Sequence, residues 1–388
     1  MKILAVLPFV PYPPTQGDRL RAWDMLTALA AVGDLTVRII APGVNRTQRC
    51  LALECLVSSV EFHPLTPGNV LIGAIAGLLS GLPPGITAYW RGPSGAKTGS
   101  NATSWDLAVA FQLRSAPYVL AESADLRVLE LTDALGRYRK QLPWRGRAAV
   151  QRVLLGGVEA LEQDMPQKFD HVWVCARDDA DWIERLSKRD VQVIPNGCNP
   201  ISAPPPYRSA GPILFIGNMR YPPNEDGIMW FARHVWPIWA RQWPLKRLRI
   251  VGTPTGNVRR LSGQSGIEVT GFVPSVAQEF AEASVVINPI RFGSGTNRKI
   301  VDAWAAARPV ISTPTGIRGL PCDPGHDVLV AGSASEWCAQ LTKLCTNESL
   351  GATLGERGWL LARQHLSARD IWADAIEAMC RLHQRNHI

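Results

Sequence analysis

The sequence predicts an α/β protein with two domains, each built on a parallel sheet. Residues 2–7 and 35–40 are short apolar runs typical of strands, and residues 18–33 between them repeat apolar side chains at helical spacing. Such a βαβ opening favours parallel pairing. The alternation begins again after residues 202–211 (SAPPPYRSAG), whose prolines and small polar residues are typical of a linker. A chain of 388 residues is long enough for both domains.

The first domain is expected at residues 1–203. Its first helix is expected to begin at Asp18, as the N-cap, and to end at Gly33, as the C-cap. A long helix is expected within residues 144–168, ahead of a strand that contains His171. Together the expected strands that follow the βαβ opening lie at 60–63, 107–111, 128–131, 171–175 and 191–194.

A linker at residues 204–211 is expected to lead into a second domain at 212–368. A C-terminal helix at 369–388 follows, for which we consider a return to the first domain. Glycines at 351–358 indicate a break in the helical region that begins at residue 334. Within the second domain the expected strands lie at 213–216, 248–251, 267–270, 284–290 and 310–313, with a helix at 224–241.

The composition is that of a folded chain whose charge favours an anionic ligand or surface. Hydrophobic residues make up 46%, charged residues 19%, and the net charge is +8. A basic chain can bind nucleic acid, an anionic membrane or a phosphorylated substrate. Nucleic acid is the least favoured, because no dense run of Lys and Arg with interleaved aromatic residues is present. Eight cysteines without CxxC spacing favour reduced thiols in a cytoplasmic protein over zinc or disulfides.

Two apolar stretches are too short to cross a membrane. Residues 1–14 fit a first strand better than a signal peptide. Residues 70–82 (VLIGAIAGLLSGL) fall well below the ~20 residues of a membrane span, and they end at Pro83. We expect a core helix there, with a helix lying on a membrane surface as the alternative.

Residues 292–313 (FGSGTNRKIVDAWAAARPVIST) predict a phosphate site. The segment begins with Gly293 and Gly295 and then becomes helical. Glycine lets a backbone approach a ligand, and the amides of a first helical turn favour an anion. Arg298 and Lys299 add positive charge at the helix end where it is unfavourable, which indicates a negative ligand. The alternative is an ordinary surface loop with a solvated charge cluster.

Further residues fit a sugar nucleotide at this place. Asp302 lies three residues after Lys299, so we expect it on the same helix face, where a carboxylate can accept hydrogen bonds from sugar hydroxyls. In open parallel sheets ligands lie at the carboxyl ends of strands. Glycines that follow expected strands could line one cleft there, although each alone fits a structural turn: Gly17, Gly217, Gly252, Gly271, Gly293 and Gly295.

A set of short motifs resembles, in order and spacing, the retaining glycosyltransferases of family 4. These have the GT-B fold, in which two Rossmann-like domains with parallel sheets face a central cleft. The second domain carries FIGNM at 215–219, PN at 223–224, IVG at 250–252, VTGFVP at 269–274, NP at 288–289, KIVDA at 299–303 and RPVIST at 308–313. The first adds PNG at 195–197 and Gly17 with Arg19 and Arg21. More narrowly, the chain is similar to bacterial sugar transferases associated with exopolysaccharide and the exosortase protein-sorting system.

The resemblance implies roles for the matched residues. Of the family's two acidic residues, the second corresponds to Asp302, which would bind ribose hydroxyls. The first corresponds to Ser294, so the glutamate that contacts the donor sugar is missing. Lys299, with Arg298, would neutralise the leaving diphosphate. Around the donor, backbone amides near 295–297 would hold the diphosphate and Val273 would contact the base; the donor residues are Gly17, Gly217, Asn218, Val273, Gly293, Ser294, Gly295, Thr296 and Asn297.

The implied reaction breaks the bond between the anomeric carbon and the diphosphate. Preorganised amides and a cation would stabilise the charge that builds on the phosphate oxygens. The family reacts without a metal, and its retention is attributed to front-face attack with the leaving phosphate accepting the proton. The acids at 178–181 (DDAD) fit the start of a helix and not a metal-binding loop. We therefore expect no metal and no cofactor besides the nucleotide-sugar substrate.

Other polar side chains have two interpretations each. Arg114 and Asp133 follow expected strands of the first domain and could contact donor or acceptor, or form structural ion pairs. Arg21 is interpreted as a solvated helix charge, and Arg220 with Tyr221 could face the cleft. His171 is not interpreted as catalytic. Tryptophans at apolar helix positions are interpreted as core residues: Trp230, Trp236, Trp239 and Trp304.

The sequence thus predicts a cytoplasmic glycosyltransferase. It could be free in the cytoplasm or bound peripherally to the cytoplasmic face of a membrane. It would move a sugar from a nucleotide donor to a polysaccharide or lipid-linked glycan. Two alternatives stay open. One is a nucleotide-sugar epimerase of the same fold, which needs acid–base groups in the cleft. The other is a non-catalytic nucleotide-sugar-binding subunit, which Ser294 keeps open.

Overall fold

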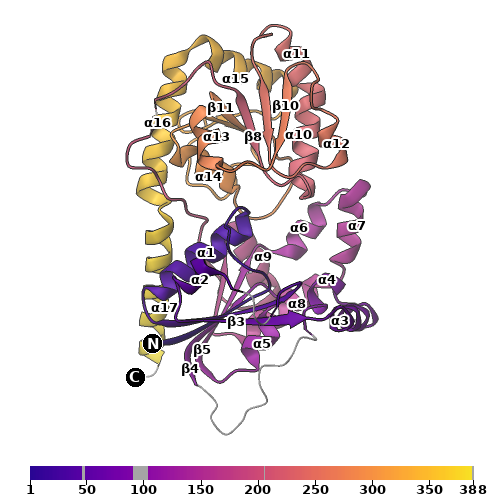
Figure 1. Cartoon of the computed structure of the whole chain (residues 1–388), viewed down its shortest axis with the longest axis vertical. Helices are drawn as coiled ribbons and strands as arrows, with labels where there is room; N and C mark the ends of the chain where they lie inside the picture. The colour runs from indigo at the N-terminus through magenta and orange to yellow at the C-terminus, as the bar shows by residue number, and fades with distance from the viewer. Residues whose placement is uncertain (46–48, 91–103, 205, 387–388) are drawn as a thin grey trace. The chain divides into compact units, whose positions relative to one another are not determined.

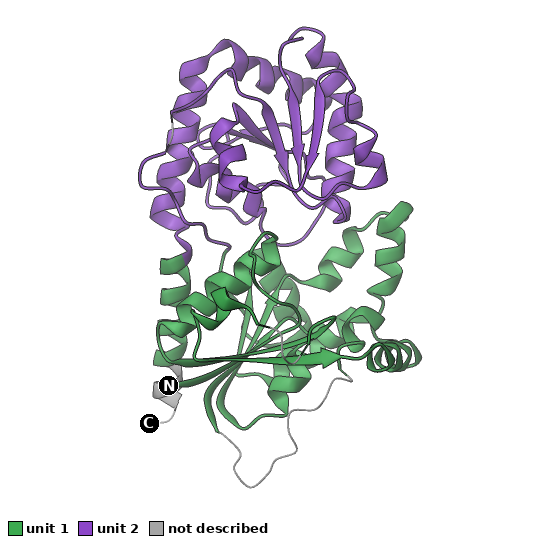
Figure 2. Ribbon diagram, in the orientation of Figure 1, with its two compact units in different colours: residues 1–195, 369–388 green, residues 196–368 purple. Residues whose placement is uncertain are grey.

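The computed structural model of the chain describes residues 1–45, 49–90, 104–204 and 206–386. It divides into two compact units (Figure 2). Unit 1 is Met1–Pro195 with Arg369–Ile388, and unit 2 is Asn196–Ala368. Pro205, within the expected linker, lies outside the described residues. The expected domain ranges stay predictions.

Unit 1 is built on a sheet of seven parallel strands in the order β3-β2-β1-β4-β5-β6-β7. Helices lie on both faces of the sheet (Figure 1). Its strands are β1 (Lys2–Leu7), β2 (Asp34–Pro42), β3 (Ser59–Leu65), β4 (Trp105–Phe111), β5 (Ala124–Thr132), β6 (His171–Val174) and β7 (Gln192–Val193). Its helices are α1 (Gly17–Ala30), α2 (Leu51–Glu54), α3 (Pro67–Leu79), α4 (Pro84–Thr87), α5 (Ala116–Leu120), α6 (Leu135–Gln141), α7 (Gly146–Leu154), α8 (Val158–Asp164), η1 (Met165–Lys168), α9 (Arg177–Ser187) and α17 (Ala368–Asn386).

The core of unit 1 lies on both faces of its sheet. Side chains of a strand alternate between faces, so Ile3 joins one cluster and Leu4 the other. Trp372 and Ile376 of α17 join the cluster of Ile3. The last helix therefore packs on the first unit's sheet, as we considered from the sequence.

Unit 2 is built on six parallel strands in the order β10-β9-β8-β11-β12-β13. Its strands are β8 (Ile213–Ile216), β9 (Leu248–Val251), β10 (Ile267–Gly271), β11 (Val285–Asn288), β12 (Val310–Ser312) and β13 (Leu329–Val330). Its helices are α10 (Pro222–His234), α11 (Trp236–Ala240), α12 (Gly256–Arg259), α13 (Val276–Glu282), α14 (Arg298–Ala305), α15 (Ala334–Thr346) and α16 (Glu348–His365). The α/β class with two parallel sheets is confirmed.

Several expected helix boundaries are wrong. Helix α1 begins at Gly17 after Gln16, and Asp18 lies in its first turn. The long helix expected at 144–168 is interrupted after α7, because Gly157 takes a left-handed conformation with a φ of 79°. The break expected at 351–358 is absent from the described chain, since those residues lie inside α16. A Cβ at Gly358 would lie 2.2 Å from the ring of Trp304, so this glycine lets α16 approach α14 closely.

Candidate active site

The candidate site lies where the strand order of unit 2 reverses direction. Strands β9 and β10 extend the sheet to one side of β8, whereas β11, β12 and β13 extend it to the other. The loops that follow β8 and β11 therefore separate at their carboxyl ends, which leaves the crevice where α/β sheets bind ligands. Gly217 and Asn218 follow β8, and the segment 289–297 follows β11. Seven of the nine expected donor residues thus come from the two loops that border this crevice, and the other two are Gly17 and Val273.

The loop after β8 is held by a close contact with the loop after β9. Gly252 has a φ of 118°, and a Cβ there would lie 2.0 Å from the carbonyl oxygen of Gly217. Neither a side chain nor an ordinary backbone conformation fits this position. Asn224, at the start of α10, donates from Nδ2 to the carbonyl oxygen of Asn218 at 2.9 Å. This hydrogen bond fixes the orientation of the Asn224 amide, because its nitrogen faces Asn218 and its oxygen is turned elsewhere.

The loop after β11 leads into the N-terminus of α14. Gly295 has a φ of 67°, in the left-handed region. Thr296 accepts a hydrogen bond at Oγ1 from Asn196 at 2.9 Å. Asn297 is the N-cap residue, but its Nδ2 donates to the carbonyl oxygen of Gly316 at 2.9 Å and its side chain makes no cap. Asparagine usually caps a helix with its side chain, but the first turn of α14 has no such cap.

Lys299 reaches from this helix to the loop after β8. Its Nζ donates to Asn224 Oδ1 at 2.6 Å and lies 4.6 Å from the centre of the Phe215 ring. Burial lowers the pKa of Lys299 to about 7. Among the ion pairs of the described residues, none includes Lys299. Lys299 thus donates to a neutral amide, and an anion beside it would favour the charged form of its ammonium group.

Arg298 and Asp302 form a pair one turn apart on α14. Arg298 Nε lies 3.4 Å from Asp302 Oδ1, and the two side chains are 9% and 29% exposed. We expected Asp302 to share a face with Lys299, but the structure turns Lys299 to Asn224 and gives Asp302 to Arg298. The carboxylate of Asp302 keeps partial exposure, so it retains room for a hydroxyl ligand.

The remaining expected residues are placed as follows. Gly293 and Ser294 lie in the same half-buried loop as Gly295. Val273 follows β10, an edge strand that β9 separates from β8. Gly17 belongs to unit 1, where it begins α1 and has no atom within 4 Å of where a Cβ would lie. Arg220 is exposed.

Asn224 is the residue that the sequence reasoning missed as a site residue. It is separated from Lys299 by 75 positions, and it stood in the sequence only as part of a PN motif. Its place in the first turn of the helix that follows the Gly217 turn was the available signal.

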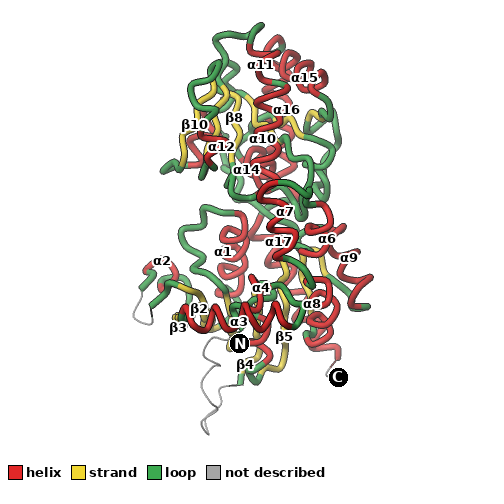
Figure 3. Tube along the Cα trace, turned by 90° about the vertical axis from the view of Figure 1, so that its right-hand side faces the viewer, coloured by secondary structure: helices red, strands yellow, loops and turns green. Residues whose placement is uncertain are grey.

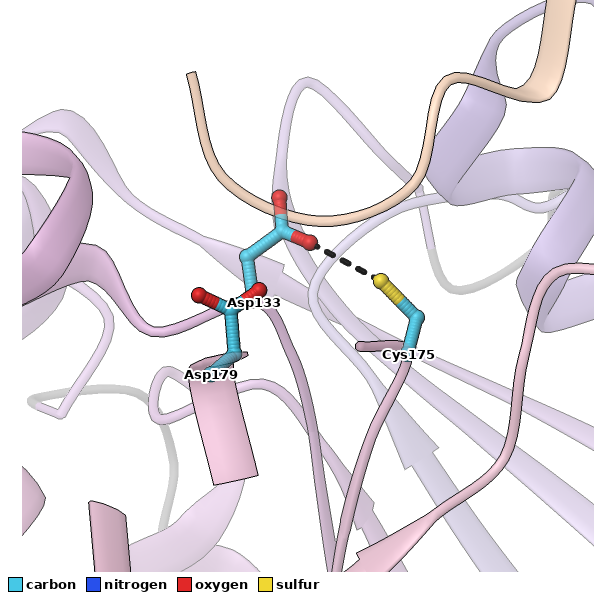
Figure 4. Close-up of side chains that lie close together, drawn as sticks. All are labelled: Asp133, Cys175 and Asp179. Carbon is cyan, nitrogen blue, oxygen red and sulfur yellow. Dashed lines mark hydrogen bonds between the residues drawn. The ribbon is translucent and has the colours of Figure 1, made fainter. Parts of the chain in front are cut away.

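Unit 1 contains a separate cluster in which Asp133, Cys175 and Asp179 bring their ligand atoms within 4.8 Å of one another (Figure 4). Cys175 Sγ donates to Asp133 Oδ1 at 3.1 Å, and burial raises the pKa of this thiol well above its usual range. Arg137 Nη1 lies 3.1 Å from Asp179 Oδ1. A protonated thiol and an arginine thus account for the proximity of these groups without a metal ion.

The interpretation of Arg21 as a solvated charge is wrong. Arg21 is 1% exposed, and its Nε and Nη2 each donate at 2.9 Å to Glu130, which is 0% exposed. Its Nη1 donates to the carbonyl oxygen of Ile194, and Trp372 lies against its guanidinium. Arg114 also has structural contacts, since it donates to the carbonyl oxygen of Gly85.

Residues 211–347 match the family model described as "Glycosyl transferases group 1". The matched residues lie within unit 2. The match begins before β8 and includes both loops of the candidate site as well as α14.

The other similar proteins have low sequence identity to this chain. An uncharacterized 44.6 kDa protein in the cps region of Klebsiella pneumoniae is 26% identical over 129 residues, which cover 31% of this chain and 33% of that protein. Sucrose-phosphate synthase from Thermosynechococcus elongatus is 15% identical with a TM-score of 0.70, over 99% of this chain and 100% of that one. Anabaena HepE, solved in complex with UDP and glucose, is 16% identical with a TM-score of 0.67, over 98% and 99%. The fold is GT-B.

The GT-B fold and the match of residues 211–347 to the group 1 family model together support a glycosyltransferase. Within the described part of the chain, no helix combines the length and the apolar character needed to cross a membrane.

Proposed function

We propose that this protein transfers a sugar from a nucleotide-sugar donor to a glycan or lipid-linked glycan acceptor. The donor's diphosphate would lie in the crevice between the loops after β8 and β11. The contact between Lys299 and Asn224 carries this proposal, because it brings a cation to the switch point without a carboxylate beside it. The match of the same unit to the group 1 family model supports it.

The site's own residues supply the chemistry that the reaction requires. Negative charge builds on the diphosphate as its bond to the anomeric carbon breaks, and a fixed cation with helix amides stabilises that charge. In this proposal Lys299 and the first turn of α14 perform this function, assisted by Arg298. Asp302 accepts from the ribose hydroxyls, and the backbone near Val273 contacts the base. No metal takes part, because Lys299 supplies the neutralising charge.

Finer features of the proposal draw on the comparisons and the motifs. UDP is the first nucleotide to test, since Anabaena HepE was solved with UDP and glucose. A role in exopolysaccharide or cell-surface glycan synthesis is supported by the relative from a cps region. Retention of the anomeric configuration follows from the resemblance to family 4. A lipid-linked acceptor would bring the enzyme to the cytoplasmic face of a membrane.

A turnover assay with UDP-, GDP-, ADP- and dTDP-sugars in EDTA tests the proposal. Wild-type protein is incubated with each donor and a lipid-linked glycan fraction, and products are identified by mass spectrometry and NMR. We expect transfer from one donor class, about a hundredfold slower in Lys299→Met, since one charge-stabilising group typically contributes 10²–10³. Lys343→Met, at an exposed lysine of α15, is the matched control.

Three outcomes would contradict the proposal. An epimerised donor would indicate the epimerase. Nucleotide binding with no turnover on any acceptor would favour a binding subunit, for which the absence of a carboxylate at Ser294 is the supporting feature. Equal rates in Lys299→Met and Lys343→Met would remove the switch-point site from the reaction.

A further inference from the structure

Helix α3 of unit 1 belongs to a long stretch without charge. Residues 64–90 contain no Asp, Glu, Lys or Arg. The helix begins after Thr66, whose side chain accepts from the Asn69 amide, and its thirteen residues read PGNVLIGAIAGLL. The sequence led us to expect a core helix here.

The structure places the large apolar side chains of α3 outward instead. The helix buries only Gly73 and Gly77. A Cβ at Gly73 would lie 2.5 Å from the Thr87 carbonyl oxygen, so this glycine face lets α4 approach closely. Five large side chains on the remaining surface are 47–85% exposed: Leu71, Ile72, Ile75, Leu78 and Leu79. A water-facing helix ordinarily presents polar residues there, so this face indicates a partner.

Helix α7 continues the exposed apolar surface. Trp144 is 71% exposed, and Val150, Val153 and Leu154 are 49–64% exposed. The ends of the two helices meet, because a Cβ at Gly157 would lie 1.8 Å from the Gly81 carbonyl oxygen. Figures 1 and 3 show both helices on the same flank of unit 1, which faces the viewer in Figure 3.

The charged residues of the segment that contains α7 are all basic. Residues 134–158 contain six basic and no acidic side chains. Arg137 pairs with acids of α9 and Arg139 with Glu159. Lys140, Arg145 and Arg147 are exposed. Arg152 stacks 4.8 Å from the centre of the Trp144 ring. Basic side chains beside exposed aliphatic residues and a tryptophan are the pattern of an interfacial membrane helix.

We propose that this flank docks on an anionic lipid bilayer, with α3 and α7 lying in the headgroup region. The docking surface consists of Leu71, Ile72, Ile75, Leu78, Leu79, Trp144, Val150, Val153 and Leu154, with Lys140, Arg145 and Arg147 beside them. Thirteen residues of helix reach about 20 Å, against a hydrocarbon core of about 30 Å, so α3 lies in the surface and does not span it.

A bilayer fits this surface better than a second copy of the chain. A symmetric contact would bring the basic segments of two copies near one another, and like charges disfavour such an arrangement. The exposed face of α3 also offers no charged group to set the register of a protein partner. Anionic headgroups attract the exposed basic side chains, and the acyl region receives the aliphatic ones.

Vesicle flotation with the full chain tests the proposal, and it is independent of the donor site. Vesicles contain phosphatidylcholine alone or with phosphatidylglycerol. The apolar variant is Ile75→Glu with Leu79→Glu, and the charge variant is Arg145→Glu with Arg147→Glu. The matched controls are Leu245→Glu and Arg259→Glu with Arg260→Glu, at exposed positions of unit 2.

We expect wild type and both controls to bind the anionic vesicles and to release them in high salt, which screens surface charge. The apolar and charge variants should each bind at least tenfold more weakly, with unchanged circular dichroism. Binding equal to wild type in both variants would overturn the proposal. So would a wild-type dimer that the apolar variant converts to a monomer without vesicle binding in either, because a second copy would then cover α3.

Discussion

The two sheets share a strand order but differ in how charge is compensated at their carboxyl ends. In unit 1 the buried charges near these ends, those of Arg21 and Asp179, form closed pairs, by which we mean that the protein itself supplies the counterion. Arg21 and Glu130 are both buried and joined by two hydrogen bonds, and Arg137 holds Asp179. Such pairs are complete within the protein and need no ligand.

At the candidate site of unit 2, Arg298 pairs with Asp302, whereas Lys299 forms no ion pair with the described residues. Lys299 meets the neutral amide of Asn224, and burial lowers its pKa to about 7. Both units bury charged groups, so burial of a charge does not by itself indicate a ligand-binding site in this fold. The distinguishing feature is whether the protein itself supplies the counterion, and five predictions test this distinction.

The largest expected effect is on stability, from breaking the closed pair of unit 1. Arg21→Met would leave Glu130 buried without its partner, and we expect a loss of about 3–5 kcal/mol in the free energy of unfolding. Urea denaturation followed by tryptophan fluorescence measures it. Arg21→Met with Glu130→Leu should recover most of the loss, because both charges are then absent. A single variant as stable as wild type would show that the pair is not a structural unit.

The next effect comes from giving unit 2 the counterion it lacks. Asn224→Asp would place a carboxylate against Lys299 and convert this site to the closed arrangement of unit 1. Nucleoside diphosphate affinity should fall about tenfold or more, roughly 1.4 kcal/mol, because the new carboxylate competes with the diphosphate. Calorimetry measures it, with Asn257→Asp at an exposed position of α12 as the control. Unchanged affinity would place the diphosphate elsewhere.

A smaller effect is expected on pH dependence of binding. A bound diphosphate favours the charged ammonium, so binding takes up a proton above pH 7. Affinity should therefore fall between pH 7 and 9, by at most about tenfold per unit. Titrations in buffers of different ionisation enthalpy measure the proton uptake. Lys299→Met should abolish it, and proton release by wild type would contradict the assignment.

The same lysine gives stability a defined pH trend. Its pKa is lowered from 10.5 in the unfolded chain to about 7, so the folded chain binds fewer protons between these values. The contribution of Lys299 to the free energy of unfolding should therefore become more favourable as pH rises through this window. Lys299→Met should flatten the curve relative to wild type, which chemical denaturation at several pH values would show.

The smallest effect is expected from removal of metal. Arg137 already compensates Asp179, and the Cys175 thiol is protonated, so EDTA should change nucleotide affinity less than twofold. Calorimetry with and without the chelator measures this. A large loss that Mg²⁺ or Mn²⁺ restores would contradict a cation site made by Lys299 alone.

Local pattern was sufficient for much of the fold. Strands β8 and β9 have the expected bounds, because short apolar runs followed by glycine are typical of buried parallel strands. The glycine loop and its helix were also expected where the structure has them. Helix ends were less predictable, since the glycines of α16 are used for close packing on α14 and not for a break.

Long-range contacts set the limit of the sequence prediction. Arg21 and Glu130 are 109 positions apart, and Lys299 and Asn224 are 75 apart, so neither pairing has a local signal. Helix α3 shows a different limit. Its residues are apolar all around, and only the packing of Gly73 and Gly77 on α4 decides which face is exposed.

A calorimetric titration is the direct test of whether the switch point of unit 2 binds the diphosphate. Wild-type protein, Lys299→Ala and the control Lys343→Ala are titrated without metal against UDP, GDP, ADP and dTDP. One nucleotide should bind wild type and Lys343→Ala alike, and Lys299→Ala at least tenfold more weakly, roughly 1.4 kcal/mol. If no nucleotide binds, or if Lys299→Ala binds as tightly as wild type, the switch point of unit 2 is not the diphosphate site.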